Sequence, residues 1–317
     1  MKDAMGILEK CNLCPRDCRA DRIRGETGYC RIADKILIAH YGPHYGEEPP
    51  ISGTHGSGNI FFASCNLRCV FCQNFQISHG SVGNSINIDE LVEIFFALED
   101  MAVHNINLVS PTPYVPFIIS ALQSAKEQGL QAPIVYNTHA YETVGTLKML
   151  DGLVDIYLPD FKYWSGDIAN RLSCARDYPE SARRAILEMK RQVGNLVIED
   201  GIARKGILVR HLVLPSNLAG SKKVLRWIEQ ALGIETYISL MAQYNPMHRA
   251  EDYPMLCRSI RQEEYDSLLN FLETEGFENV FIQELESAPL FVPDFESEEP
   301  FPSEYVKMSG QGNEEIP

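Results

Sequence analysis

The sequence predicts an α/β chain whose parallel strands form a partial barrel, and three observations lead to this prediction. Short apolar runs alternate with amphipathic stretches from Gly58 onward, which is typical of βα units. Six or seven such units fit into about 225 residues, a length that suits a barrel or a partial barrel. Nearly every predicted strand ends in polar residues, as the rim of a barrel site requires. A doubly wound sheet is the main alternative, because periodicity does not separate the two folds.

The predicted strands and helices alternate along the chain. The strands are short apolar runs and comprise Asn59–Ser64, Asn105–Ser110, Pro133–Asn137, Val154–Leu158, Ile207–Leu214 and Thr236–Met241, with Val280–Gln283 as a candidate seventh. The helices have amphipathic periodicity and comprise Asp89–Val103, Pro116–Gln128, Glu142–Leu150, Glu180–Val193, Lys222–Leu232 and Arg261–Glu275. Asp89 and Ser221 stand at the start of apolar-periodic segments, so we expect them to cap their helices.

Composition limits the classes of function. The chain has 317 residues with 28 basic and 43 acidic side chains, a net charge of −15, which makes nucleic acid an unlikely partner. Hydrophobic residues make up 45% and charged residues 22%, as in an ordinary folded globular chain. No run approaches the ~20 apolar residues of a membrane span, and Met1–Lys10 lacks a signal-peptide core. We therefore expect a cytoplasmic protein with no membrane partner.

The texture of the sequence divides the chain into three segments. Residues 1–56 form a Cys-rich N-terminal extension, residues 57–288 form the barrel, and residues 289–317 form an acidic, Pro/Ser/Gly-rich tail. We expect this tail to be poorly ordered or draped on the surface. Within the extension, His40–His55 is predicted to be a Gly/Pro-rich linker rather than a metal site.

A loop with three cysteines follows the first predicted strand. Cys65, Cys69 and Cys72 lie within eight residues after Ser64, and Phe71 precedes the last of them. Such a short loop can wrap an iron–sulfur cluster, and three protein ligands leave one iron open to a small molecule, as a catalytic zinc keeps one open position. A three-cysteine zinc loop and a set of buried, unreactive thiols are the alternatives.

This loop resembles the Cys-x3-Cys-x-aromatic-Cys signature of the radical S-adenosylmethionine superfamily. The resemblance implies a 4Fe–4S cluster on Cys65, Cys69 and Cys72, with the amino and carboxylate groups of S-adenosylmethionine on the fourth iron. It also implies a partial (β/α)6 TIM barrel and a 5′-deoxyadenosyl radical that abstracts a substrate hydrogen atom. From Cys11 to Gln283 the chain resembles pyruvate formate-lyase activating-enzyme homologues of the longer branch, which carry an N-terminal cysteine set. That resemblance favours a protein or peptide substrate and implies a one-electron donor such as a flavodoxin or ferredoxin.

The candidate residues for binding S-adenosylmethionine stand at the carboxyl ends of predicted strands, where a barrel carries its active site. They are Ser110, Thr112, Asn137, Thr138, Asp160, Lys162 and Arg210. Ser110 and Thr112 replace the family's Gly-Gly-Glu segment, and their hydroxyls can meet the amino group. The resemblance further implies that Asn137 and Thr138 reach the carboxylate or the ribose.

Two further segments match the family at strand ends. Asp160 and Lys162 resemble its Asp-x-Lys segment, which suits ribose hydroxyls and a carboxylate. Arg210 resembles its strand-five arginine, an always-charged bidentate donor near the cofactor carboxylate. Structural ion pairs are the alternatives for these residues, and loop solvation and helix capping are the alternatives for Asn137 and Thr138. Isolated histidines are more often structural than catalytic, which applies to His139, His211 and His248.

The N-terminal extension carries a second cysteine set. Cys11, Cys14, Cys18 and Cys30 supply four thiols within twenty positions, which would close either a zinc site or an auxiliary iron–sulfur cluster. Interspersed arginines either offset the thiolate charge or form a solvated basic face; they are Arg16, Arg19, Arg22 and Arg24. The Arg16–Arg31 stretch is also a candidate docking patch for an acidic electron donor. Cys174 and Cys257 are isolated and are expected to be core or helix thiols.

Three functions are therefore consistent with the sequence. The first is a radical S-adenosylmethionine enzyme that acts on a protein or peptide, in the manner of a glycyl-radical activating enzyme. The second keeps this chemistry but acts on a small molecule or RNA. The third is a non-catalytic iron–sulfur electron-transfer protein, for which a barrel of this size is a large scaffold.

Overall fold

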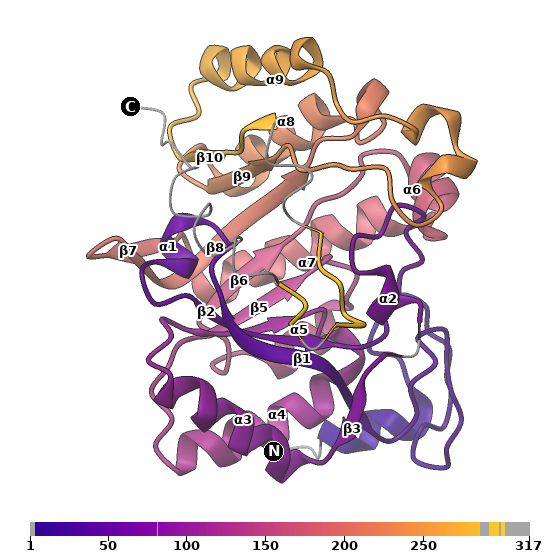
Figure 1. The fold of residues 1–317 in the computed structure, drawn as a ribbon, viewed down its shortest axis with the longest axis vertical. Coiled ribbons are helices and arrows are strands. Elements are labelled where there is room, and N and C mark those ends of the chain that lie inside the picture. The colour runs from indigo at the N-terminus through magenta and orange to yellow at the C-terminus, as the bar shows by residue number, and fades with distance from the viewer. Residues whose placement is uncertain (1–3, 81, 286–291, 298, 302–317) are drawn as a thin grey trace.

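The chain has a mixed α/β fold built on a sheet of mainly parallel strands (Figure 1). The computed structural model describes residues 4–80, 82–285, 292–297 and 299–301 of the chain. Within these residues the parallel strands follow one another across the sheet in chain order. They are β2 (Ser57–Phe62), β4 (Ile106–Val109), β5 (Ile134–Thr138), β6 (Ile156–Pro159), β8 (Ile202–Leu212), β9 (Tyr237–Met241) and β10 (Val280–Ile282).

The order of these strands distinguishes the two predicted folds. A doubly wound sheet reverses its strand order at a switch point. Here each parallel strand pairs with the next parallel strand along the chain, so the doubly wound alternative is wrong. In the described part of the chain β10 stands at one edge and β3 at the other, and the sheet is wound in one direction like an open barrel wall.

Three strands of the structure were not predicted. β1 (Ile36–His44) pairs antiparallel with β2 and extends the sheet into the N-terminal extension. The linker prediction is therefore wrong for residues 40–44. Gly42, Pro43 and a bulge near Ile38 interrupt the alternation by which a strand is recognised. The other two are short and lie at the periphery: β3 (Asn84–Ile86) and β7 (Val197–Glu199).

Helices connect and cover the strands, and Figure 1 shows α3 and α4 together along one side of the sheet. The α-helices of six residues or more in the described part of the chain are α3 (Ile88–Asp100), α4 (Val115–Glu127), α5 (Val144–Met149), α6 (Gly166–Ser173), α7 (Tyr178–Val193), α8 (Ser221–Leu232) and α9 (Gln262–Glu275). Two shorter helices of four residues each, α1 (Pro49–Ser52) and α2 (Phe75–Ser78), precede them in the chain. The sequence did not predict α6. Among the described residues, no helix has the length and apolar character needed to cross a membrane.

The predicted helix caps need correction. Asn87, not Asp89, caps α3: its Oδ1 accepts from the Glu90 N–H at 2.9 Å, and the Glu90 carboxylate accepts in return from the Asn87 N–H. This reciprocal capping box satisfies two N–H groups that the helix leaves open. Gly220 precedes α8, so Ser221 is its first helical residue rather than its cap.

Part of the acidic tail packs against the sheet instead of extending over the outer surface. Phe295 is buried, and its ring lies 5.2 Å from that of Phe61 on β2. The Gln76 amide donates to Asp294 at 2.8 Å and accepts from the Phe295 N–H at 2.9 Å. Residues 289–291, 298 and 302–317 of the predicted tail lie outside the described residues.

Candidate active site at the strand ends

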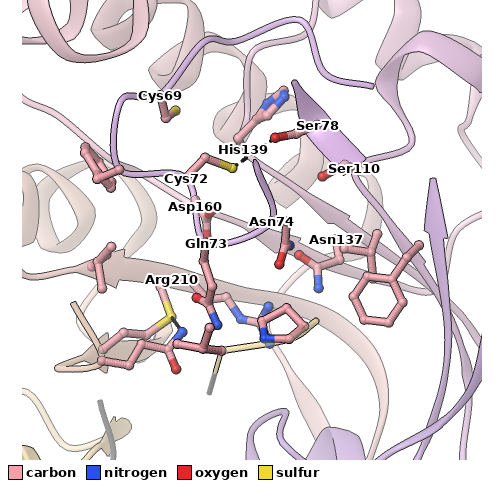
Figure 2. Close-up of a pocket in the computed structure, with 18 of the residues that line it drawn as sticks. Cys69, Cys72, Gln73, Asn74, Ser78, Ser110, Asn137, His139, Asp160 and Arg210 are labelled. Atoms are coloured by element: carbon pink, nitrogen blue, oxygen red, sulfur yellow. Dashed lines mark hydrogen bonds between the residues drawn. The ribbon is translucent and has the colours of Figure 1, made fainter. Parts of the chain in front are cut away.

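A cavity of about 250 Å³ opens at the carboxyl ends of the parallel strands (Figure 2). Its lining joins the three-cysteine loop to residues that follow β4, β5 and β6 and to side chains of β8 and β9. The predicted site residues on its wall are Cys65, Cys69, Cys72, Ser110, Asn137, Thr138, Asp160, Lys162 and Arg210. The fold therefore brings together residues that are up to 145 positions apart in the sequence.

Local hydrogen bonds hold the three-cysteine loop in shape. Ser64 has a left-handed backbone (φ 68°), which turns the chain sharply out of β2. The Arg68 guanidinium donates to the Cys65 carbonyl at 2.7 Å. Ser173 Oγ lies 2.9 Å from Cys69 Sγ, and Ser78 Oγ lies 3.1 Å from Cys72 Sγ, the dashed contact in Figure 2. Each of these two thiols thus has a hydroxyl neighbour able to donate to its sulfur.

The environment of these thiols suits metal ligands rather than free nucleophiles. Burial raises the pKa of Cys65, Cys69 and Cys72, in the case of Cys72 to about 11. Repulsion from Cys69 raises the pKa of Cys65 and of Cys72 further, which identifies the sulfurs as close neighbours. Buried thiols of this kind ionise when a metal centre supplies the compensating charge.

The three thiols of the loop can each bind a different iron of one cluster. In the described residues no three His, Cys, Asp or Glu side chains converge closely enough to hold one metal ion. A 4Fe–4S cluster takes one thiolate per iron, so its ligands are necessarily spread apart around it. Three thiols on one short loop beside an open cavity therefore fit a cluster with one accessible iron.

Asp160 and Lys162 form an ion pair on the cavity wall. Lys162 Nζ lies 2.5 Å from Asp160 Oδ2, and both side chains are about four-fifths buried. Burial opposes the charge of Lys162, yet Asp160 and Cys69 outweigh it and hold the pKa of Lys162 above its ordinary value. His139 lines the same cavity, and burial lowers its pKa to about 3, so the imidazole is neutral. The wall therefore offers one fixed cation beside the thiols.

The hydroxyls of Thr112 and Thr138 are engaged by a residue that sequence reasoning missed. Both donate to Glu142 Oε1, Thr112 at 2.6 Å. Burial raises the pKa of Glu142 from 4.5 to about 7. Thr112 is buried behind the cavity, whereas Ser110 and Asn137 line it. Glu142 carried no sequence signal, because an acidic residue near a helix start is commonplace.

Arg210 forms ion pairs with two carboxylates of the N-terminal extension. Its Nε donates to Glu48 Oε1 at 2.8 Å, and its Nη2 contacts both Glu47 and Glu48. All three side chains are at most 9% exposed. This geometry matches the ion-pair alternative for Arg210, and the two glutamates were hidden in the predicted linker.

Sequence comparison identifies relatives over most of the chain. No family model matches the sequence. The uncharacterised protein MJ0674 of Methanocaldococcus jannaschii is 30% identical over 286 residues, which cover 88% of this chain and 78% of that protein. The chain belongs to the MJ0674 family. A second uncharacterised protein of that organism, MJ0808, is 23% identical over 77% of this chain and 73% of its own length.

Structure comparison places the fold of this MJ0674-family chain beside that of a solved protein. Streptococcus suis SuiB, solved with the precursor peptide SuiA bound, matches 74% of the chain with a TM-score of 0.50 and 14% identity. This likeness shows a shared fold. The chain spans half the length of SuiB.

In this member of the MJ0674 family the N-terminal cysteine set packs directly against the three-cysteine loop. Asn66 lies beside the Cys14 thiol, whose pKa burial raises to about 12. Ser64 Oγ donates to the Cys30 carbonyl, and the Arg68 guanidinium donates to the Tyr29 carbonyl at 2.9 Å. Cys11, Cys14 and Cys30 lie within electrostatic reach of one another.

Two arginines of the predicted docking stretch have structural contacts, whereas Arg19, Arg24 and Arg31 are exposed. Arg22 is fully buried and donates to the carbonyls of Ala33 and Pro113. Arg16 donates to the Asn66 carbonyl at 2.9 Å and stacks 3.8 Å from the centre of the Tyr29 ring. These two side chains therefore hold the extension in place.

The other predicted polar residues divide into structural and exposed ones. His211 is buried between the Phe161 carbonyl and the Ser221 hydroxyl, as expected of a structural histidine. His248 lies 2.9 Å from His79 at the surface. The isolated cysteines Cys174 and Cys257 are exposed at the C-terminal ends of α6 and of the 3-10 helix Pro254–Leu256. Of the two predicted positions, core or helix, the core position is therefore wrong.

Proposed function

We propose that this chain is a radical S-adenosylmethionine enzyme. The observation that carries the proposal is the placement of Cys65, Cys69 and Cys72 on one loop beside a cavity at the carboxyl ends of a singly wound sheet. When bound, the cluster and S-adenosylmethionine supply one-electron cleavage of the sulfonium and a 5′-deoxyadenosyl radical that abstracts a substrate hydrogen atom.

The side chains of the wall have distinct parts in this proposal. Lys162 supplies a fixed positive charge for the cofactor carboxylate and for the ligated thiolates. Asp160, Ser110 and Asn137 offer acceptors and donors for the amino group and the ribose. Burial of this wall excludes water, which protects a radical from side reactions. Thr112 and Thr138 contact the Glu142 carboxylate, and Arg210 contacts Glu47 and Glu48. We assign these three residues to positioning rather than to direct cofactor contact.

The substrate that we propose is a protein or peptide, as for glycyl-radical activating enzymes. The resemblance of the chain to those enzymes supports this, as does the peptide bound by SuiB, a protein of like fold.

A reduced flavodoxin or ferredoxin is the proposed electron donor. For the N-terminal set we propose metal binding, with zinc and an auxiliary cluster as the two candidates. A small-molecule substrate is the second candidate, favoured by the modest cavity of about 250 Å³.

Reductive cleavage tests the proposed function. Protein purified and reconstituted with iron and sulfide under anaerobic conditions, then reduced with dithionite, is expected to convert S-adenosylmethionine to 5′-deoxyadenosine. Cys69→Ala removes a proposed ligand and is expected to abolish the product. Cys257→Ala, which removes an exposed thiol away from the cavity, is the matched control and is expected to keep it. Equal product from wild type and Cys69→Ala refutes the assignment.

Binding separates this proposal from electron transfer alone. An electron-transfer protein has no use for S-adenosylmethionine, so calorimetry on the reconstituted protein is expected to detect binding only if the enzyme proposal holds. The absence of any binding heat, with the cluster assembled, would favour the non-catalytic function.

A further inference from the structure

A buried cluster of charged side chains contributes to the cavity wall away from the cysteines. We call it the Arg210 cluster and define it as Glu47, Glu48 and Arg210, with Asn59 and Asn107 beside them. Glu47 and Arg210 line the cavity. One guanidinium faces two carboxylates, and the charged side chains are at least nine-tenths buried.

The Arg210 cluster carries an excess of negative charge. Burial alone would raise the pKa of Glu47, but Arg210 outweighs burial and holds that pKa below its ordinary value, so the carboxylate is ionised. Burial lowers the pKa of the neighbouring His44, which is therefore neutral at pH 7. Asp160, also near Arg210, is paired with Lys162. A buried charge without its counter-charge is unfavourable, so the cluster is incomplete as a set of side chains.

Two amide oxygens beside Glu47 lack donors. Asn59 on β2 and Asn107 on β4 are register partners, and each is at most 1% exposed. Their Nδ2 groups donate to the same Glu47 Oε1, at 2.7 and 3.1 Å. These bonds fix the orientation of each amide, because a flipped amide would place its Oδ1 against Glu47 Oε1, and both atoms are acceptors. Within the described part of the chain, neither Oδ1 has a hydrogen-bond partner.

We infer that the Arg210 cluster binds an organic ammonium group of the substrate, such as a lysine side chain or an alkyl amine. An ammonium carries the single positive charge that balances the excess, and its N–H donors suit the Glu47 carboxylate, which lines the cavity, and the bare amide oxygens of the wall behind it. A water molecule would supply donors but no charge. A hard divalent cation such as Ca²⁺ or Mg²⁺ would exceed the charge and takes six or more oxygen ligands. The inference rests on the proposed function, because it assigns the ammonium to that enzyme's substrate.

Matched five-carbon probes test the inference. Calorimetry measures the binding of n-pentylamine, 1-pentanol and pentanoate to the reconstituted protein without reductant, so the result does not depend on cofactor cleavage. The amine is expected to bind at least about tenfold more tightly than the alcohol, and pentanoate is expected not to bind. Equal affinities for amine and alcohol overturn the inference.

Variants connect this binding to the cluster. Glu47→Gln removes the excess charge and is expected to abolish the preference for the amine, whereas the exposed Glu93→Gln keeps it. If Glu47→Gln does not fold by far-UV circular dichroism, Asn107→Leu removes one bare oxygen and is expected to weaken amine binding several-fold. A folded Glu47→Gln or Asn107→Leu with wild-type affinity for the amine overturns the inference.

Competition identifies the source of the ammonium. S-adenosylmethionine has an amino group of its own, so the titration is repeated with the cofactor at saturation. Unchanged amine affinity supports a substrate site, and direct competition overturns the assignment to substrate. Displacement of the amine by millimolar Ca²⁺ overturns it in favour of a metal site. Amine binding by a wild-type protein that yields no 5′-deoxyadenosine would refute the proposed function alone, and product formation without any preference for the amine would overturn this inference alone.

Discussion

The buried carboxyl of Glu142 leads to a quantitative prediction about stability. Glu142 accepts hydrogen bonds from Thr112 and Thr138 through one oxygen, while Oε2 has no partner among the described residues. Burial raises its pKa from 4.5 to about 7. Because one pKa unit corresponds to about 1.4 kcal/mol, this rise is equivalent to about 3 kcal/mol between the protonated and ionised forms.

The direction of the pH dependence follows from linkage. The folded protein holds the Glu142 proton more tightly than the unfolded chain, so the protonated carboxyl stabilises the fold below pH 4.5. This stabilisation is lost as the pH rises through about 7. Between pH 5.5 and 8.5 the free energy of unfolding is expected to fall by about 2 kcal/mol on account of this group.

Glu142→Gln isolates this contribution. The amide keeps an oxygen for the two threonines and places an N–H₂ group near the Tyr136 hydroxyl, which also lacks a partner among the described residues. Anaerobic guanidinium unfolding from pH 5.5 to 8.5 gives the difference between wild type and variant, which removes the contributions of other titrating groups. Glu93→Gln, at an exposed site, is the control. Parallel pH profiles for wild type and Glu142→Gln would refute the reasoning.

Three further predictions concern the cofactor wall, the tail and the second cysteine set. Lys162→Met is expected to weaken S-adenosylmethionine binding at least about tenfold in calorimetry, because it removes the buried cation, while Lys162→Arg retains part of the affinity. Gln76→Ala removes two hydrogen bonds to the tail, about 1 kcal/mol each, so limited proteolysis is expected to cut near Phe295 faster without a change in melting temperature. A Cys11/Cys14→Ser variant is expected to lose about four irons per chain if the second site holds a cluster, or about one zinc if it holds zinc, as elemental analysis measures.

The sequence predicted the parts of the molecule whose signals are local. Each parallel strand is an apolar run, so its position was recovered to within a few residues, although for β8 the predicted start at Ile207 missed five residues. The three-cysteine loop has its spacing written into eight residues. Because the loop directly follows a buried strand, parallel-sheet geometry predicts that it lies at the edge where the carboxyl ends of the strands meet.

The sequence did not predict contacts that depend on distant residues. Glu47 is recognised as a buried charged residue only through its contact with Arg210, which is 163 positions away. Asn59 and Asn107 contact Glu47 only after β2 and β4 have paired. Arg22 resembled a solvated basic residue because burial of an arginine is visible only once its carbonyl partners are in place. Periodicity reports which face of an element is buried, and not which polar groups meet there.

The N-terminal extension is part of the candidate site rather than an appendage to it. Its first part packs Cys14 against Asn66, the residue directly after Cys65 of the three-cysteine loop, and its later part supplies β1 and Glu47. Removal of this segment would therefore expose the back of the cysteine loop, open the edge of β2 and leave Arg210 buried without either carboxylate. An uncompensated buried guanidinium alone costs several kcal/mol, a large fraction of the stability of a domain. We conclude that the extension and the barrel wall must fold as one cooperative unit, with the cavity completed only when both are present.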